Sequence, residues 1–395
     1  MTKDIILTID FAVLVRYENR FCDAAYIDQI IQKAAQRNVR TILWRTLAGA
    51  RGAYRSRSVP SFEDQSPKWG PLLKAVDPLE AAVASAHKHG IKLFAWATLQ
   101  DFHIVRQAGK IQNVTPFFDR NPHLYWSSLD GKSFHPGIPC YAYPEARQYY
   151  LDHIQEVLGY GVDGVYVCFR SHCGEPHRND EFGYNEPWLN QLRDELGFVP
   201  SVEEQCDHPW LSYRLQKVRG TSYTHLLADI RNLVGDACPV WVGVGEEPDI
   251  LIAGHSAKEN PQRAFHRVRL DVRGWCRDGL VDTVIVVVSR LNPCDPSPAH
   301  IYRDTTDRYG KKLYPWLNLI SHFRNSQGQA HKHTPPPDQL RKIVAAVQDD
   351  EVDGAVLHEV ADLEFSYQRI YIDGKKDSKI EPQVDRDAQW DALLG

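Results

Sequence analysis

Short apolar runs alternate with segments of helical periodicity along the chain, and this happens eight times. The runs are rich in β-branched residues, as is typical of strands buried on both faces of a parallel sheet. They are Ile5–Ile9, Val39–Trp44, Lys92–Ala97, Gly164–Phe169, Val240–Val244, Thr283–Val288, Leu313–Ile320 and Gly354–Leu357. Eight strand–helix units close a barrel, so we predict an α/β fold of the (β/α)₈ barrel class. An open, doubly wound sheet is the alternative, but no glycine-rich phosphate loop follows Ile9.

The segments between the runs carry helix signals. Asp77 can cap a helix whose first residue is Pro78, and Gly90 ends it. The other expected helices are Tyr26–Arg37, one that begins at Pro144, Ser222–Val234, Asp271–Asp278, Ile301–Tyr309 and Asp338–Gln348. The fourth and eighth runs are both preceded by Val-Asp, at Val162 and Val352, and both begin with glycine; the sixth has a near variant, Val-Asp-Thr.

Two insertions and a tail interrupt the regular alternation. The longer insertion, 171–221, follows the fourth strand, and we expect helices in it at Glu186–Phe198 and Val202–Val218. The other, Thr46–Ala75, follows the second strand and is loop-like. We expect residues 1–365 to form the barrel domain, with the insertion as part of it. Residues 366–395 are expected to form a C-terminal hairpin and tail packed on the barrel, because the residues on either side of Asp373-Gly374 alternate.

Composition excludes several classes of protein. Hydrophobic residues make up 43% of the chain and charged residues 25%, as in soluble globular proteins. The net charge of −5 argues against a general nucleic-acid binder, and no apolar run is long enough to span a membrane. The eight cysteines form no CxxC pair and are expected to be free thiols. We therefore expect a cytoplasmic protein, or a secreted or periplasmic one if a signal peptide has been removed. Its oligomeric state is left open.

The active sites of such barrels lie at the C-terminal ends of the strands. Carboxyl groups expected there are Asp10, Asp101, Glu246, Glu247 and Glu359, with Glu175, Asp362 and Glu364 further along their loops. Glycoside hydrolysis uses one carboxylic acid to protonate the leaving oxygen and a second carboxylate as nucleophile or base. The adjacent Glu246 and Glu247 are the first candidates, because a neighbouring like charge keeps an acid protonated. The alternative for one of this pair is that it only caps the next helix or faces solvent. For Asp10, Asp101 and Glu359 the alternative to direct chemistry is a salt bridge at the rim of the barrel.

Other polar and aromatic residues at the strand ends are candidates for substrate binding. They are Arg45, Arg170, His172, Glu175, Arg290, Asn318 and His358, together with Trp44, Trp96 and Trp188 for stacking on sugar rings. Arginine suits carboxylate and sulfate groups, so the substrate is expected to contain an anionic sugar, unless these arginines only balance nearby acids. His172, Cys173, Glu175 and His177 lie in one short loop rather than in two separated ligand pairs, so no metal site is expected. No organic cofactor is expected either.

Five segments follow one another in an order and spacing that resemble those of a known family. They are Gly90–Gln100, Asn121–Lys132, Tyr143–Val167, Leu270–Val286 and Val352–Val360. Together they resemble the glycosyl-hydrolase-like family 10, a group of (β/α)₈ barrels, over most of the chain from about Asp4 to Leu363. The resemblance implies a hydrolase of oligo- or polysaccharides. In the family pattern the fourth strand ends in acidic residues, whereas here Cys168 and Phe169 stand in those places. The carboxylate that the resemblance implies for this strand is therefore missing, or its role has moved to Glu175.

We therefore predict a glycoside hydrolase that uses two carboxyl groups at the C-terminal end of the barrel. Two alternatives remain open. One is a barrel that binds carbohydrate without cleaving it, because the acids implied for the fourth strand are missing. The other is a sugar lyase in which His172 is the base and arginines neutralise a uronate.

Overall fold

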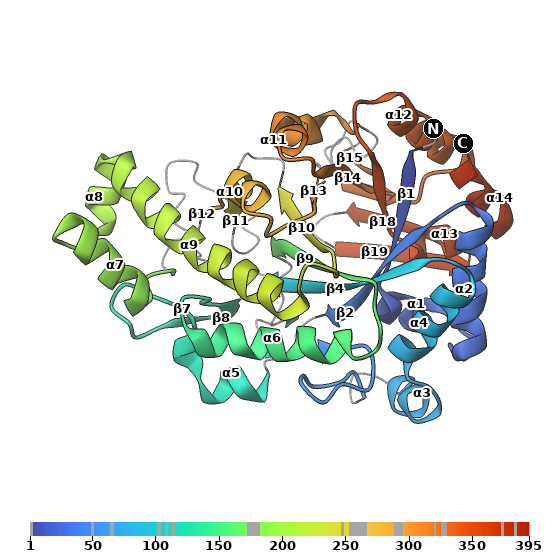
Figure 1. Cartoon of the computed structure of the whole chain (residues 1–395). Helices are drawn as coiled ribbons and strands as arrows, with labels where there is room; N and C mark the ends of the chain where they lie inside the picture. Colours follow the sequence, from blue (N-terminus) through green and yellow to red (C-terminus); the bar gives the residue numbers. More distant parts are fainter. Residues whose placement is uncertain are drawn as a thin grey trace.

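A closed ring of parallel strands forms the centre of the molecule (Figure 1). The computed structural model describes residues 3–48, 51–63, 67–100, 104–106, 110–112, 115–171, 182–245, 249–252, 267–287, 295–319, 321–324, 330–372, 375–382 and 385–394. The ring consists, in order, of β1 (Asp4–Ile9), β2 (Thr41–Ala48), β4 (Lys92–Gln100), β9 (Gly164–Ser171), β10 (Val240–Gly245), β13 (Thr283–Val287), β14 (Lys312–Asn318) and β17 (Gly354–His358). β1 pairs with both β2 and β17, which closes the barrel. The predicted fold class and all eight predicted strands are confirmed.

Helices surround the ring on its outside (Figure 1). Those predicted from the sequence are α2 (Ala24–Gln36), α4 (Pro78–Lys88), α6 (Pro144–Leu158), α10 (Val272–Arg277), α11 (Arg303–Arg308) and α12 (Pro337–Asp349). Shorter helices are α1 (Phe11–Tyr17), α3 (Trp69–Ala75), α5 (Pro116–Arg120), α13 (Ala361–Glu364) and α14 (Arg386–Asp391), with 3₁₀ turns η1 (Pro122–Leu124), η3 (Ser297–Tyr302) and η4 (Ala392–Leu394). No helix in the described part of the chain is both long and apolar enough to cross a membrane.

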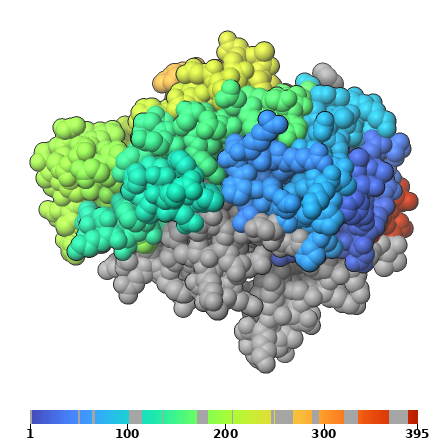
Figure 2. Space-filling view, turned by 90° about the horizontal axis from the view of Figure 1, so that it is seen from below, coloured from blue at the N-terminus to red at the C-terminus, as the bar shows by residue number. Residues whose placement is uncertain are grey.

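The insertion after β9 differs from the sequence prediction. Its helices are α7 (Glu186–Leu196), α8 (Val202–Asp207) and a 26-residue α9 (Pro209–Val234), so the two helices expected on either side of Gly220 are one. Gly220 does not interrupt α9. It allows close packing, because a Cβ at this position would lie 1.7 Å from the carbonyl oxygen of Arg269. The three helices project from one side of the barrel as a lobe, which Figure 2 shows in yellow-green.

Small antiparallel sheets complete the fold. The predicted C-terminal hairpin is present as β18 (Phe365–Ile372) and β19 (Lys375–Pro382), which extend a sheet formed by β15 (Ser321–Arg324) and β16 (Ala330–His333). The other small strands are β3 (Arg51–Gly52), β5 (Ile104–Arg106), β6 (Lys110–Gln112), β7 (Tyr125–Ser127), β8 (Phe134–Pro139), β11 (Ile250–Ile252) and β12 (Arg267–Arg269). The segment expected to be loop-like, Thr46–Ala75, contains β3 and α3. The proposed division of the chain at residue 365 stays a prediction.

The repeated Val-Asp in the sequence has a structural explanation. In each case the aspartate and a residue of the preceding neighbour strand exchange two hydrogen bonds. The aspartate N–H donates to a backbone carbonyl, and its carboxylate accepts from the N–H of the same residue. The pairs are Asp163 with Leu93, Asp282 with Val240 and Asp353 with Leu313, with N–H to carboxylate distances of 2.8 Å. These aspartates therefore fix the register of three strand pairs at the N-terminal end of the barrel.

The barrel interior is filled mainly by large aromatic side chains. Inward-facing residues alternate along each strand, as the pleat requires. The interior cluster contains Ile6, Leu43, Phe94, Trp96, Tyr166, Cys168, Trp241, Ile285, Tyr314, Trp316 and Val356. Trp96 lies edge to face against Trp316 with ring centres 5.2 Å apart, and Phe94 and Trp241 are 4.3 Å apart. We call this group the aromatic plug; it separates the two ends of the barrel.

Because the aspartates of the Val-Asp pairs fix the register of neighbouring strands, replacing one of them should lower stability. Asp163→Ala leaves the Leu93 N–H without its acceptor and should lower the free energy of unfolding by roughly 1–2 kcal/mol. Asp163→Asn keeps a side-chain oxygen and should lose less. Urea unfolding measures both, with Asp194→Ala on the exposed side of α7 as the control. Equal stability of Asp163→Ala and wild type would contradict the role.

Candidate active site

The C-terminal ends of β1, β2, β14 and β17 bring five of the predicted site residues together. Asp10 and Glu359 directly follow β1 and β17. Arg45, Asn318 and His358 each follow an inward-facing residue of the aromatic plug by two positions, so the strand alternation places them on the same inner side. We call this end of the barrel the mouth. It is the end at which barrels of this class carry their active sites.

Asp10 and Arg45 form an ion pair at the mouth. Arg45 Nη1 donates to Asp10 Oδ2 at 2.6 Å, and its Nε donates to the Leu47 carbonyl at 3.2 Å. Its guanidinium lies 5.1 Å from the centre of the Trp96 ring. The other carboxylate oxygen of Asp10 accepts from the Ala12 N–H at 3.1 Å and caps α1. Asp10 thus makes the rim salt bridge that was the alternative to direct chemistry, and both of its oxygens are engaged.

Glu359 is the carboxyl group best suited to hold a proton. It is 8% exposed, and the His358–Glu359 peptide bond is cis. Burial raises the pKa of Glu359 well above its usual value, and the negative charges of Asp10 and Asp362 raise it further, while Arg45 lowers it. A raised pKa favours the protonated form, which can donate its proton to a leaving group.

Asp362 is a second buried acid beside Glu359. It lies in α13, and its Oδ2 accepts from the Glu359 N–H at 3.3 Å. Burial raises the pKa of Asp362 to about 8, although this hydrogen bond acts in the opposite direction. The sequence signal for this arrangement is the spacing Glu-x-x-Asp directly after the last strand, which places both carboxyl groups at the start of one helical turn.

His358 lies against the upper face of the aromatic plug. Its Nδ1 shares a hydrogen bond with Thr8 Oγ1 at 2.9 Å and lies 3.9 Å from Glu359 Oε2. Its ring centre is 4.9 Å from that of Trp316 and 5.9 Å from that of Trp96. In the described part of the chain, three buried donors near it have no hydrogen-bond acceptor: Trp96 Nε1, Trp316 Nε1 and Asn318 Nδ2. Trp96 is 0% and Trp316 2% exposed, so these indoles lie beneath the surface of the mouth, and Trp96 cannot stack on a sugar in this structure.

Two of the predicted stacking residues lie elsewhere. Trp44 is on the outward face of β2, where its ring stacks on Phe11 at 5.2 Å in the core between strands and helices. Trp188 belongs to α7 and packs edge to face on Trp126 at 5.5 Å. Both are about 1% exposed, so neither can stack on a sugar. The expectation for Trp44 was wrong because the strand pleat turns the residue beside an inward-facing one outward.

Glu364 makes contacts that hold the fold together. Its carboxylate accepts from Lys33 Nζ and from Arg386 Nη1, both at 2.9 Å, and from the Trp390 indole at 2.8 Å. These contacts attach α14 to the barrel, so Glu364 is occupied away from the mouth.

The remaining candidates lie outside the described residues. They are Asp101, His172, Glu175, Glu246, Glu247 and Arg290. The backbone of Arg170 ends β9, but its side chain also lies outside the described set. The loop with His172, Cys173, Glu175 and His177 is not described either. Among the described residues, no group of three His, Cys, Asp or Glu side chains can hold a metal ion.

Comparisons with known proteins agree with the fold. The family model described as glycosyl hydrolase-like 10 matches residues 10–317. The catalytic domain of β-amylase from Paenibacillus polymyxa superposes with a TM-score of 0.54 at 9% identity, over 91% of this chain and 93% of that one. A chitinase from Rhizomucor miehei covers 91% of this chain and 94% of its own with a TM-score of 0.41 at 10% identity. No protein among the curated sequences matches. At such identities the β-amylase likeness shows the barrel fold alone.

The buried acids predict an unusual dependence of stability on pH. The folded state holds a proton on Asp362 up to a pKa of about 8, whereas the unfolded chain releases it near 3.8. Stability contributed by this proton is present at low pH and is lost as pH rises between these values. We expect Asp362→Asn, which keeps an oxygen for the Glu359 N–H, to stabilise the protein at pH 8 relative to wild type, by roughly 3–4 kcal/mol more than at pH 5.

Urea unfolding of both proteins at the two pH values measures this difference. Asp338→Asn, on the exposed start of α12, is the control and should show no such dependence. If Asp362→Asn and wild type lose the same stability between pH 5 and pH 8, Asp362 does not hold the proton.

Proposed function

The chain belongs to the glycosyl hydrolase-like 10 family, and we propose that it hydrolyses glycosidic bonds at the mouth with Glu359 as general acid. The observation that carries this proposal is the environment of Glu359. It is a buried carboxyl group at the end of the last strand, flanked by two further acids, with Arg45 as the nearby cation. The family relation and the glycosidase-like barrel support a carbohydrate substrate.

The reaction needs a second carboxylate. Asp10 is held by Arg45 and by the N-terminus of α1, so its main effect is to keep Glu359 protonated. We propose that Glu246 or Glu247, which follow the end of β10 in the sequence, acts as the base or nucleophile. In this scheme Glu359 gives its proton to the leaving glycosidic oxygen, and water supplies the hydroxyl group at the anomeric carbon. Whether the water attacks directly or after a glycosyl–enzyme intermediate depends on the distance between the carboxyl groups.

The charges at the mouth bear on the substrate. Asp10, Glu359 and Asp362 share one described arginine, Arg45, which is already paired. A negatively charged sugar unit next to Glu359 is therefore disfavoured. We propose that the unit bound beside Glu359 is neutral. A uronate or sulfated unit would need another cation, and the sequence candidates for it, the Arg170 side chain and Arg290, lie outside the described set.

One observation favours a second candidate, a barrel that binds carbohydrate without cleaving it. The fourth barrel strand, β9, carries no carboxylate between Gly164 and Ser171, and Cys168 is part of the aromatic plug. The family resemblance implies acids at this strand. If Glu359 has no second carboxylate as a partner, the mouth would bind a sugar without hydrolysing it.

Glu359→Gln tests the proposal. On a panel of neutral and uronate-containing oligosaccharides, with products identified by mass, the variant should lose roughly 10²–10⁴-fold in kcat, because Gln cannot donate the proton. KM should change little. Wild-type activity should fall as pH rises through the raised pKa of Glu359. Glu203→Gln, on the exposed face of α8, should keep full activity.

Full activity in Glu359→Gln would overturn its role as the acid. Full activity in both Glu246→Gln and Glu247→Gln would overturn the assignment of the second carboxylate to this pair. Glycan binding by the wild type without any product would favour the binding protein. An unsaturated product that absorbs in the ultraviolet would instead indicate a lyase.

A further inference from the structure

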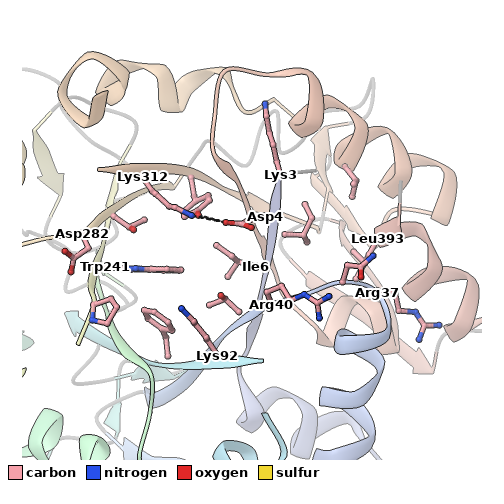
Figure 3. A pocket seen from close by; sticks show the side chains of 18 of the residues that line it. Lys3, Asp4, Ile6, Arg37, Arg40, Lys92, Trp241, Asp282, Lys312 and Leu393 are labelled. Atoms are coloured by element: carbon pink, nitrogen blue, oxygen red, sulfur yellow. Dashed lines mark hydrogen bonds and ion pairs between the residues drawn. The ribbon is translucent and has the colours of Figure 1, made fainter. Parts of the chain in front are cut away.

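We propose that the opposite, N-terminal end of the barrel holds a second binding site, for a sugar-sized molecule that bears a carboxylate or phosphate group. A cavity of about 980 Å³ opens there, of a size that suits a small ligand. It is lined by the first residues of six barrel strands and by the segments that precede them (Figure 3). We call this cavity the base cavity.

Two glycines allow close packing beside the base cavity. β9 and β17 begin with Gly164 and Gly354, where other strands carry a side chain. A Cβ at Gly164 would lie 2.2 Å from the Phe94 ring, and one at Gly354 would lie 2.1 Å from the Asp4 carbonyl oxygen. Glycine at the first of these positions therefore lets Phe94 lie flat against β9. The floor of the cavity is the lower part of the aromatic plug, with Trp241 next to Phe94.

The lining carries more positive than negative charge, in a chain whose net charge is −5. Five cationic side chains and three carboxylates contribute: Lys3, Arg37, Arg40, Lys92 and Lys312, and Asp4, Asp236 and Asp282. Two of the carboxylates are already neutralised. Asp4 accepts from Lys312 at 3.1 Å, and Asp282 accepts from Arg231, outside the lining, at 2.5 Å. Because Lys312 is itself one of the five cations, and Arg37 pairs with Asp391 outside the lining at 2.6 Å, these ion pairs leave the excess of positive charge in the cavity unchanged.

Arg40 and Lys92 supply the available positive charge. They are neighbours across the β2–β4 pair, because the Lys92 N–H donates to the Arg40 carbonyl at 2.9 Å. Both are exposed, and neither side chain has an ion-pair or hydrogen-bond partner among the residues that the structure describes. Lys92 and Lys312 extend into the cavity from two sides of Trp241 (Figure 3). Two cations and an aromatic edge therefore face the same space.

These groups define the chemical class of the ligand. A guanidinium binds a carboxylate or phosphate through two parallel hydrogen bonds, and an ammonium adds a point charge. Thr41 and Thr283 offer hydroxyl groups, and Trp241 offers an apolar surface for a ring. A sugar acid and a sugar phosphate share this chemistry. A neutral sugar lacks the group that Arg40 and Lys92 would bind.

The base cavity is separate from the mouth. Asp4 lines the cavity and Asp10 lies at the mouth, so β1 spaces them by about 20 Å along the strand. The aromatic plug fills the barrel between the two ends. A ligand in the base cavity therefore does not reach Glu359, and the proposal does not depend on the reaction proposed for the mouth.

Titration calorimetry with glucuronate, glucose 6-phosphate and glucose tests the proposal. We expect saturable binding of one equivalent of glucuronate, of glucose 6-phosphate or of both, and no comparable binding of glucose. The double variant Arg40→Gln/Lys92→Gln should weaken this binding roughly tenfold or more. Lys217→Gln, on an exposed turn of α9, removes a lysine far from the cavity and should bind as wild type does. Melting temperatures of all variants confirm that they are folded.

Glu359→Gln separates the two sites. It should bind the anionic sugar as tightly as the wild type, because Glu359 lies at the other end of the barrel. Loss of binding in this variant would place the ligand at the mouth and overturn the proposal. The absence of saturable binding to the wild type would overturn it as well, and so would equal binding of glucose or unchanged affinity in the double variant. None of these results depends on whether the protein cleaves a glycan.

Discussion

The packing of aromatic side chains inside the barrel is the constraint on which both ends of the molecule depend. A barrel of eight strands has room for side chains but not for a channel. Here the space is filled by tryptophan, tyrosine and phenylalanine rather than by the branched aliphatic residues that dominate many such barrels. The upper rings support His358 and the Arg45 guanidinium at the mouth. The lower rings form the floor of the base cavity.

The mouth combines this rigid support with an unfavourable arrangement of charge. Among the described residues, three carboxyl groups lie near one arginine, and protonation lowers the cost of burying such acids. That cost gives Glu359 and Asp362 their raised pKa values. The same condition that lowers stability at high pH thus favours the protonated form of these acids. Raised pKa values of this kind are common where a carboxylic acid takes part in catalysis.

Much of the fold could be predicted from the sequence, because strands and helices are set by local patterns. The eight runs identified the barrel, and Asp77 and Pro78 marked the start of α4 correctly. Side-chain direction was less predictable. Trp44 and Trp96 both lie at or next to the end of a predicted strand, yet only the Trp96 side chain faces the barrel interior. A shift of one residue along a strand turns the side chain to the opposite face of the sheet. The preference for Glu246 and Glu247 stays a prediction, because both lie outside the described residues. The raised pKa of Glu359 could not be predicted, because it comes from burial by distant segments that spacing in the sequence does not reveal.

The N-terminal end of the barrel contributes to stability, and the C-terminal end carries the groups proposed for chemistry. At the N-terminal end, three aspartates exchange paired hydrogen bonds with neighbouring strands, so their carboxylates are satisfied by backbone N–H groups. At the C-terminal end, the carboxyl groups of Asp10, Glu359 and Asp362 are buried beside one another. A destabilising cluster of acids can persist only where the rest of the fold compensates for it. Because the strands are continuous from one end to the other, register fixed at the base also fixes the position of Glu359 relative to Asp10 and Arg45 at the mouth.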